Sequence, residues 1–209
     1  MKKLKIFLRF EKEERWLERM ASQGWLLCGK SFFYCFREAL PDTKTIRIDY
    51  RAFRGAKDFS DYCTLFEDSG WKHIAGTKSS GTQYFLKTNE GSTEDIFSDT
   101  LSRAGRYHRL ANMWLYSAIP FLPLLLSMKT GGWIDLNGIS SPKEWYLTPG
   151  LWDLEGLPFW WAFLFETPFA LMRGIGWLIP IIAILICSVF FVKSRLLYRS
   201  EFQNKGSDA

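Results

Sequence analysis

Hydrophobic and polar positions follow different patterns on the two sides of Arg109. Before it, apolar residues alternate with polar ones, as in the run 46–51, which is typical of a strand with one buried face. After it come two uncharged 19-residue runs, Leu110–Met128 and Gly174–Val192, each flanked on both sides by a basic residue. At about 1.5 Å per helical residue such a run spans roughly 28 Å, close to the hydrocarbon thickness of a bilayer. The pattern predicts a water-facing domain joined to two transmembrane helices.

The water-facing half contains a faint internal repeat at an offset of 46 residues. The matched residues are Trp16, Gly24 and Trp25 in the first copy and Tyr62, Gly70 and Trp71 in the second. Each copy predicts a strand, a helix that ends at the glycine, and two further strands. This order is ferredoxin-like. We therefore expect an α+β fold: a cytoplasmic ferredoxin-like domain from a duplicated strand-helix-strand-strand unit, with one antiparallel sheet, two helices on one face and an extra strand.

The same patterns set the predicted boundaries along the chain. They are an α+β domain over 1–90, a basic connector over 91–109, a transmembrane helix over 110–128, an outer Trp-rich loop over 129–173, a second transmembrane helix over 174–192 and a basic tail over 193–209.

Charge predicts the orientation of these segments. Residues 1–109 carry 20 Lys and Arg against 15 Asp and Glu, residues 129–173 carry 3 against 5, and residues 193–209 carry 4 against 2. Because cytoplasmic segments are enriched in Lys and Arg, both termini are predicted to be cytoplasmic in a multi-pass protein of the cell membrane. The residues Arg103, Arg106, His108 and Arg109 would form a membrane-proximal connector that holds the domain against anionic lipid.

The net charge of +5 does not predict a nucleic-acid partner, because acidic residues are interspersed throughout the basic half. The N-terminal run is not a signal peptide, since Lys5, Arg9 and Glu11 interrupt its apolar core. The four cysteines contain no C-x-x-C pair, and three lie in the predicted cytoplasmic domain, where thiols stay reduced.

One formal chemical motif is present, because residues 24–31 satisfy the phosphate-binding pattern G-x-x-x-x-G-K-[ST]. A working phosphate loop follows a strand and opens a helix, whereas this one follows a predicted helix and enters an aromatic, strand-like run. The repeat also explains Gly24 and Trp25 as structural residues. Nucleotide binding is therefore a minor hypothesis.

No other catalytic or metal-binding pattern is found. His73 and His108 lie in separate elements without Cys, His or carboxylate partners at metal-ligand spacing. There is no G-x-S-x-G elbow, and no triad can be assembled. The sequence predicts a protein that is not an enzyme and carries no cofactor or metal.

Glu166 interrupts an apolar stretch, 157–172, inside the predicted outer loop. Within hydrocarbon an acid would cost about 2.5–3.5 kcal/mol and would mark a functional site. The favoured interpretation is an interfacial segment with Glu166 in water, because a third span would place the C-terminus outside. Outer tryptophans at headgroup level fit this interpretation, namely Trp133, Trp145, Trp152, Trp160 and Trp161.

The chain resembles the bacterial domain-of-unknown-function family 2812 over about residues 5–110. The resemblance rests on the segments 13–17, 20–25, 34–36, 46–50 and 65–71, in which two helix–Gly-Trp units recur in order. It implies a membrane-anchored cytoplasmic domain, often encoded near PadR-like transcription regulators, and it assigns no catalytic residue.

We therefore expect a non-enzymatic membrane protein whose cytoplasmic domain binds a protein or small ligand in envelope sensing or regulation. The expected partners are the lipid bilayer and either a PadR-like regulator or a transporter subunit. The alternative hypothesis is an accessory subunit of a membrane enzyme or transporter, with Glu166 as a proton or ion site. Self-association stays open, through a free sheet edge or through Gly174 and Gly176.

Overall fold

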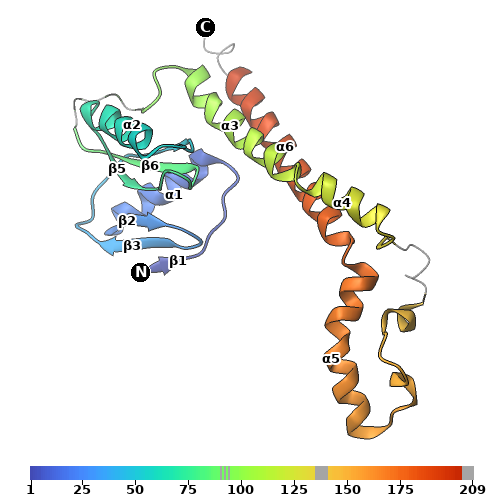
Figure 1. Ribbon diagram of the computed structural model, residues 1–209. Coiled ribbons are helices and arrows are strands. Elements are labelled where there is room, and N and C mark those ends of the chain that lie inside the picture. The colour runs from blue at the N-terminus through green and yellow to red at the C-terminus, as the bar shows by residue number, and fades with distance from the viewer. Residues whose placement is uncertain (90, 92, 94, 135–140, 204–209) are drawn as a thin grey trace. The chain divides into compact units, whose positions relative to one another are not determined.

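A computed structural model describes residues 1–89, 91, 93, 95–134 and 141–203. The remaining positions fall within the predicted domain, connector, outer loop and tail, and those parts of these predictions lie outside the described residues. The chain divides into two compact units, Met1–Ala111 with Lys193–Ala209, and Asn112–Val192. We describe each unit by itself (Figure 1).

The first half of the first unit contains β1 (Lys2–Lys3), α1 (Phe10–Ser22), β2 (Trp25–Lys30) and β3 (Tyr34–Glu38). These strands form an antiparallel sheet in the order β1-β3-β2. The repeat predicted a strand before the first helix, and the ladder with β3 there is short, because it pairs Lys2 and Lys3 alone. Ile6 and Leu8 are exposed, and Phe10 already belongs to α1, where its ring packs 4.9 Å from that of Tyr107.

The second half contains β4 (Ile46–Tyr50), α2 (Ala56–Asp68), β5 (Trp71–Ala75) and β6 (Thr82–Lys87). Its strands form a second antiparallel sheet in the order β4-β6-β5. The described strands therefore make two three-stranded sheets. The prediction of one sheet is wrong, and the ferredoxin-like arrangement is not confirmed.

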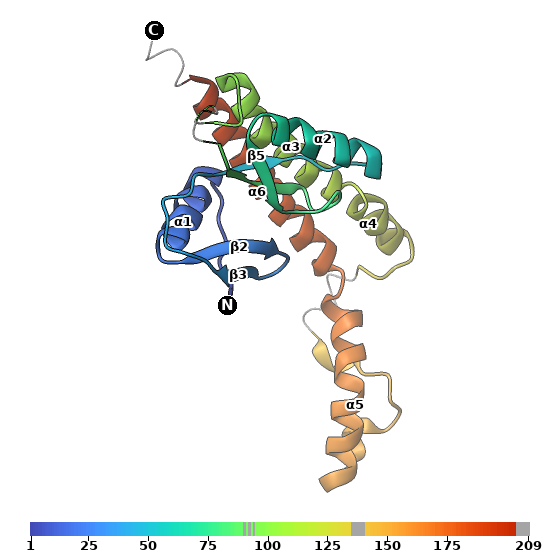
Figure 2. The ribbon, with the colours of Figure 1, turned by 90° about the vertical axis from the view of Figure 1, so that its left-hand side faces the viewer.

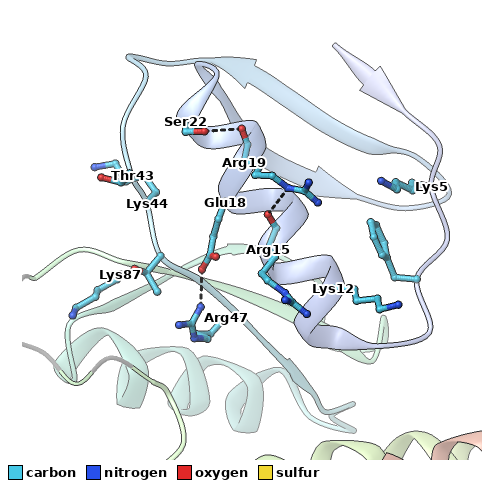
Figure 3. A pocket seen from close by; sticks show the side chains of 12 residues that line it. Lys5, Lys12, Arg15, Glu18, Arg19, Ser22, Thr43, Lys44, Arg47 and Lys87 are labelled. Atoms are coloured by element: carbon cyan, nitrogen blue, oxygen red, sulfur yellow. Dashed lines mark hydrogen bonds and ion pairs between the residues drawn. The ribbon is translucent and has the colours of Figure 1, made fainter.

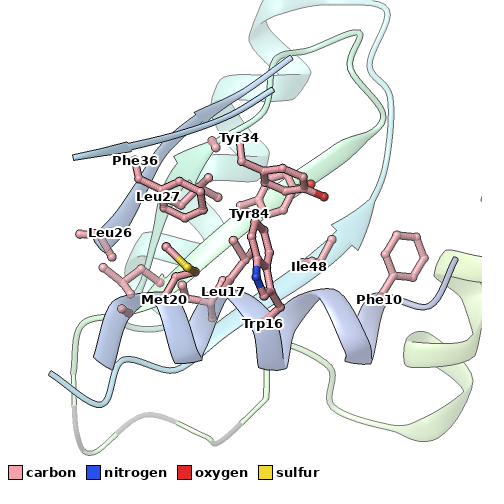
Figure 4. Packing of buried hydrophobic residues seen from close by; sticks show 14 of the residues in the cluster. Phe10, Trp16, Leu17, Met20, Leu26, Leu27, Tyr34, Phe36, Ile48 and Tyr84 are labelled. Carbon is pink, nitrogen blue, oxygen red and sulfur yellow. The ribbon is translucent and has the colours of Figure 1, made fainter. Parts of the chain in front are cut away.

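The two helices also lie on opposite faces of the second sheet, rather than on one face (Figures 1 and 2). The alternation along β6 explains this, because successive side chains point to opposite faces of a sheet. Tyr84 packs in the cluster with α1, whereas Phe85 packs with Tyr62 of α2 and Trp71 of β5. The larger cluster lies where α1 contacts both sheets, as Figure 4 shows for Leu17, Leu27 and Ile48 among others.

The two halves share two local backbone features. α1 and α2 are both 13 residues long, and each is followed by a glycine with positive φ, +84° at Gly24 and +81° at Gly70. Glycine adopts this conformation without the steric cost that a side chain incurs. The register of β2 against β3 shifts between Leu27 and Gly29, and that of β5 against β6 shifts between His73 and Ala75. Both features recur at the predicted offset of 46.

Two helical segments are long and apolar enough to cross a membrane, Thr100–Thr130 with a mean hydropathy of 1.4 and Leu178–Gln203 with 2.0. The first contains α3 (Thr100–Ala118) and α4 (Phe121–Thr130). α3 ends just before Pro120, as expected because proline disfavours helical geometry in the residue before it. The second is α6. The most apolar windows are only 6% and 17% buried, as expected of helices whose side chains face lipid.

The rest of the second unit contains the short 3₁₀ helices η2 (Pro142–Trp145) and η3 (Leu151–Asp153), followed by α5 (Gly156–Ile175). α5 covers the predicted interfacial segment and is helical throughout, with Pro168 inside it. It is not among the helices that meet the criteria for crossing a membrane.

Candidate functional site

A broad basic groove of about 1090 Å³ runs along the outer face of α1 (Figure 3). The amphipathic pattern of α1 creates this face, because Lys12, Arg15, Arg19 and Ser22 point to solvent while the intervening apolar residues enter the core. Beside them the groove is lined by Lys5, Phe7, Glu18, Thr43, Lys44, Thr45, Arg47 and Lys87.

The groove is strongly positive. Its described lining contains seven Lys and Arg residues and one acidic residue, Glu18. Glu18 is already engaged, since its carboxylate accepts hydrogen bonds from Arg47 at 2.7 Å and from the backbone N–H of Ile46 at 3.3 Å. Clustered cations in a concave surface raise the local concentration of anions. The groove is therefore a candidate anion-binding site.

A second, smaller pocket of about 190 Å³ adjoins the groove and shares Arg15, Glu18 and Arg47 with it. The guanidinium of Arg47 lies 4.0 Å from the carboxylate of Asp95, which also pairs with Arg103 near the start of α3. The charges of the groove thus continue into an ion-pair network that reaches α3.

Arg106 of α3 lines the same small pocket, is only 2% exposed and forms a separate set of ion pairs. Its guanidinium donates to Glu14 at 2.8 Å, to the carbonyl oxygen of Ile48 at 2.8 Å and to Glu11 at 2.5 Å. Burial raises the pKa of Glu14 above its ordinary value, and the charge of Arg106 opposes that shift. We call this contact set the Arg106 clamp. It attaches α3 to both α1 and β4.

The clamp is part of a row of charged side chains along the free edge of β4. The carboxylate of Glu14 accepts from the backbone N–H of Ile48 at 2.9 Å. Arg109 donates to the carbonyl oxygen of Tyr50 and to the carboxylate of Asp49, both at 2.5 Å. An open strand edge offers unpaired backbone groups, and here α1 and α3 satisfy them with side chains. The first turns of α3 are therefore built into the domain.

The predicted connector residues thus have distinct positions. Arg106 is buried by the carboxylates of the domain and is not available to lipid, whereas the side chains of Arg103 and Arg109 remain 42% and 38% exposed. His108 lies beside Tyr198 of α6, with ring centroids 5.7 Å apart. Lipid contact by the connector stays a prediction.

The clamp was not predicted, although the sequence contains a signal for it. Glu11, Glu14 and Glu18 recur at helical spacing on one face of α1, and Arg103, Arg106 and Arg109 recur every third residue on α3. Complementary stripes of this kind can pair across a helix interface. The lipid interpretation considered the arginine stripe without its acidic counterpart.

The formal phosphate-binding motif, residues 24–31, follows α1 and contains the whole of β2, so it follows a helix and forms a strand. Lys30 pairs with the buried carboxylate of Glu13 at 3.2 Å. The same oxygen of Glu13 accepts from the hydroxyls of Tyr34 at 2.7 Å and Tyr84 at 2.6 Å. Lys30 therefore belongs to a core hydrogen-bond network.

The repeat residues are structural as well. The ring of Trp16 meets that of Tyr34 edge-on at 4.9 Å, and the hydroxyl of Tyr62 donates to Asp49 at 2.9 Å. Trp71 is 1% exposed, and Trp25 packs half-buried against the main cluster.

In the second unit, Glu166 is surrounded by donors. Its carboxylate accepts from the backbone N–H groups of Leu147 at 2.5 Å and Thr148 at 2.9 Å, from the Thr148 hydroxyl, and from Arg173 at 2.7 Å. These hydrogen bonds, that of the Thr148 hydroxyl first, hold the pKa of Glu166 below its ordinary value. The contacts favour a structural role that fastens residues 147–148 to α5, and the ion-site hypothesis stays a prediction.

The predicted outer tryptophans fall into two groups. Large exposed fractions, from 45% to 76%, are found for Trp133, Trp152, Trp160 and Trp161. Trp145 instead covers Gly174, where a Cβ atom would lie only 2.2 Å from the indole ring. Gly174 therefore has a packing role within the chain, and it is buried.

The described residues contain no group of three or more His, Cys, Asp or Glu placed to hold a metal ion. The features that stand out are an α+β domain with a basic groove and a buried clamp on a helix of membrane length.

A family model described as "Protein of unknown function (DUF2812)" matches residues 9–119, just over half of the chain. The chain belongs to this family, which confirms the predicted resemblance, and the matched region includes the domain from α1 onward and all of α3. Comparison with curated proteins and comparison with solved structures gave no match.

Proposed function

We propose that this protein is a non-enzymatic, multi-pass protein of the cell membrane that acts in envelope sensing or regulation. Its cytoplasmic domain binds an anionic partner in the basic groove, and the Arg106 clamp conveys occupancy of the groove to the membrane helices. A PadR-like regulator is a candidate partner, because the family resemblance implies such a neighbour, and a transporter subunit is a second candidate.

The observation that carries this proposal is the continuity between the groove and α3. Arg47 and Glu18 line both the groove and the adjoining pocket, and Arg106 lines that pocket as well. An anion that attracts Arg47 competes with Glu18 and Asp95 for the same guanidinium. A change in those pairs alters the electrostatic environment of Arg103 and the Arg106 clamp. Such coupling requires that the network has two arrangements and that the anion binds more tightly to one of them than to the other.

We further propose that the domain arose by duplication of a strand-helix-strand-strand unit. The strand orders β1-β3-β2 and β4-β6-β5 correspond, and the helix-ending glycines and the register shifts recur at one offset. Short strands and glycines recur in many folds, but their coincidence at a single offset supports a common origin of the halves.

Cytoplasmic placement of the domain rests on the charge bias of the sequence. Cysteine labelling in intact cells tests it with the native thiol of Cys28, which is exposed. A membrane-impermeant maleimide should leave Cys28 unlabelled until the cells are permeabilised. A Trp161→Cys variant should be labelled without permeabilisation, since Trp161 is 76% exposed in the predicted outer segment. Labelling of Cys28 in intact cells would overturn the proposed topology.

The binding role is tested by photo-crosslinking of the full-length protein in cells. A photoreactive residue at Ser22, inside the groove, should capture a specific partner, whereas one at Lys57, on α2, should not. Neutralisation of Arg15 and Arg19 should reduce capture at position 22. Identical products from both positions would contradict a specific role for the groove.

A further inference from the structure

We infer that the ligand of the basic groove is an extended acidic polypeptide segment, in which Asp or Glu residues alternate with neutral ones. This inference rests on the proposed function, because it names the chemical class of the partner for the same groove. Three features of the lining carry it: the length of the positive track, its spacing and its neutral groups.

The positive track is longer than a single small anion needs. From Lys12 to Arg19 the helix rises seven residues, about 10 Å at about 1.5 Å per residue. Further cations flank this stripe, with Lys44 and Lys87 on one side and Lys5 on the other (Figure 3). A single phosphate or carboxylate would contact only part of this surface. The groove therefore fits a ligand with several separated negative charges.

The spacing of the helix cations suits an extended peptide. Arg15 and Arg19 are four residues apart, which is about 6 Å along the helix axis. In an extended chain, residues i and i+2 point to the same side and lie roughly 6.6 Å apart. Acidic residues at alternate positions can therefore face Arg15 and Arg19 together.

The neutral part of the lining distinguishes a peptide from a nucleic acid. The hydroxyls of Ser22, Thr43 and Thr45 can hydrogen-bond to peptide backbone groups between the acidic positions. Single-stranded nucleic acids are bound through aromatic rings on which bases stack. Phe7 is the one aromatic residue among the described lining residues, and its ring already packs 5.3 Å from Trp16 and 6.3 Å from Tyr34.

Fluorescence anisotropy with the full-length protein in phosphatidylcholine nanodiscs tests the inference. The probe is a labelled short peptide of alternating Asp and Ser, and the matched control peptide has Asn in place of Asp. We expect binding of the Asp peptide alone, which weakens as salt is added, because exposed charges are screened. The double variant Arg15→Gln with Arg19→Gln should weaken it about tenfold, since each exposed ion pair contributes up to about 1 kcal/mol.

The control variant Lys57→Gln with Lys72→Gln has the same change in net charge but lies outside the groove. It should leave the affinity unchanged, and equal weakening by both variants would overturn the inference. Circular dichroism should show that both variants fold, because all four side chains are exposed.

Competitors separate failure of this inference from failure of the proposed function. The competitors are tripolyphosphate, oligothymidylate and phosphatidylserine in the nanodisc, each compared with the unlabelled Asp peptide. If any of them displaces the labelled peptide at a lower concentration than the unlabelled peptide does, the acidic-peptide assignment fails. The groove then remains an anion site, provided that the Arg15 and Arg19 variant weakens that competitor. If none of these anions binds, both the inference and the proposed role of the groove fail.

Discussion

The two halves of the α+β domain share a backbone plan but differ in chemistry. At the offset of 46, Glu13 and Arg15 of α1 correspond to Phe59 and Asp61 of α2. α1 is tied to its surroundings by ion pairs and charged hydrogen bonds, whereas α2 packs on its sheet through aromatic rings, as where Phe66 lies 4.3 Å from Phe85 of β6.

The difference follows from position in the layers. α2 covers one face of one sheet, so an apolar stripe suffices for it. α1 contacts both sheets and meets the edge of β4 and the start of α3, where backbone groups and charges need partners. The candidate binding surface therefore lies in the first half, on the side of α1 that the core leaves open.

Among these variants, removal of the Arg106 clamp should lower the stability of the protein most. Arg106→Ala leaves Glu14 buried without its ion-pair partner, which costs about 3–5 kcal/mol. We expect a marked fall in the thermal unfolding midpoint of the full chain in detergent, followed by circular dichroism. Arg103→Ala removes an exposed cation and should cost about 1 kcal/mol or less. Equal effects of the two variants would show that the clamp does not hold α3.

Neutralisation of Glu13, a buried acid of the first half, should have the next largest effect. Glu13→Gln removes the charge that accepts hydrogen bonds from Tyr34, Tyr84 and Lys30. Hydrogen bonds to charged groups contribute about 1.5–3 kcal/mol, and we expect a loss in that range by the same unfolding measurement. Tyr34→Phe removes a single donor and should cost less. A Glu13→Gln variant as stable as the native chain would refute the electrostatic account of the first copy.

The glycines that end the helices test whether the halves behave alike. Gly24→Ala and Gly70→Ala each force a side chain into positive φ, which costs roughly 1–2 kcal/mol. At Gly24 the added Cβ would also lie 3.1 Å from the carbonyl oxygen of Ala39, which is a tight contact. Unfolding midpoints of the two variants give the comparison. Unchanged stability in one variant alone would show that the two helix ends are not equivalent.

The smallest expected effect is the contribution of His73 to the pH dependence of stability. At the offset of 46, His73 corresponds to Leu27 of the first half. Burial lowers the pKa of His73 from 6.5, although the hydrogen bond to Gln83 and the charge of Glu67 oppose the shift. Because its folded pKa is depressed, His73 contributes stability above pH 6.5 that is lost as pH falls through the folded pKa. The unfolding midpoint should therefore drop on mild acidification, and His73→Leu should reduce that drop. An identical drop in both proteins would assign it to other groups.

Local patterns along the chain predicted much of the secondary structure. The alternation over 46–51 corresponds to β4, and Gly24 and Gly70 follow the ends of α1 and α2 as expected. The uncharged runs predicted two helices of membrane length, although α6 begins at Leu178 rather than at Gly174. These features depend on neighbours within a few residues, which sequence periodicity reports directly.

Long-range pairing decided the rest, and periodicity does not report it. The alternation in β4 and β6 was compatible with one sheet or two, and only the pairing of strands across the chain made two. The arginines of α3 had the same spacing whether they faced lipid or carboxylates, and the tertiary structure placed Glu11 and Glu14 within reach of Arg106.

The sequence by itself therefore determined the family, the apolar helical segments and the repeated helix–glycine units. The tertiary structure alone decided the opposite placement of α1 and α2, the burial of Arg106 and the gathering of dispersed cations into one groove. The physical reason is that hydrophobic periodicity and glycine geometry act over a few residues. Ion pairs and grooves instead depend on distances between side chains up to 95 residues apart, as between Glu11 and Arg106.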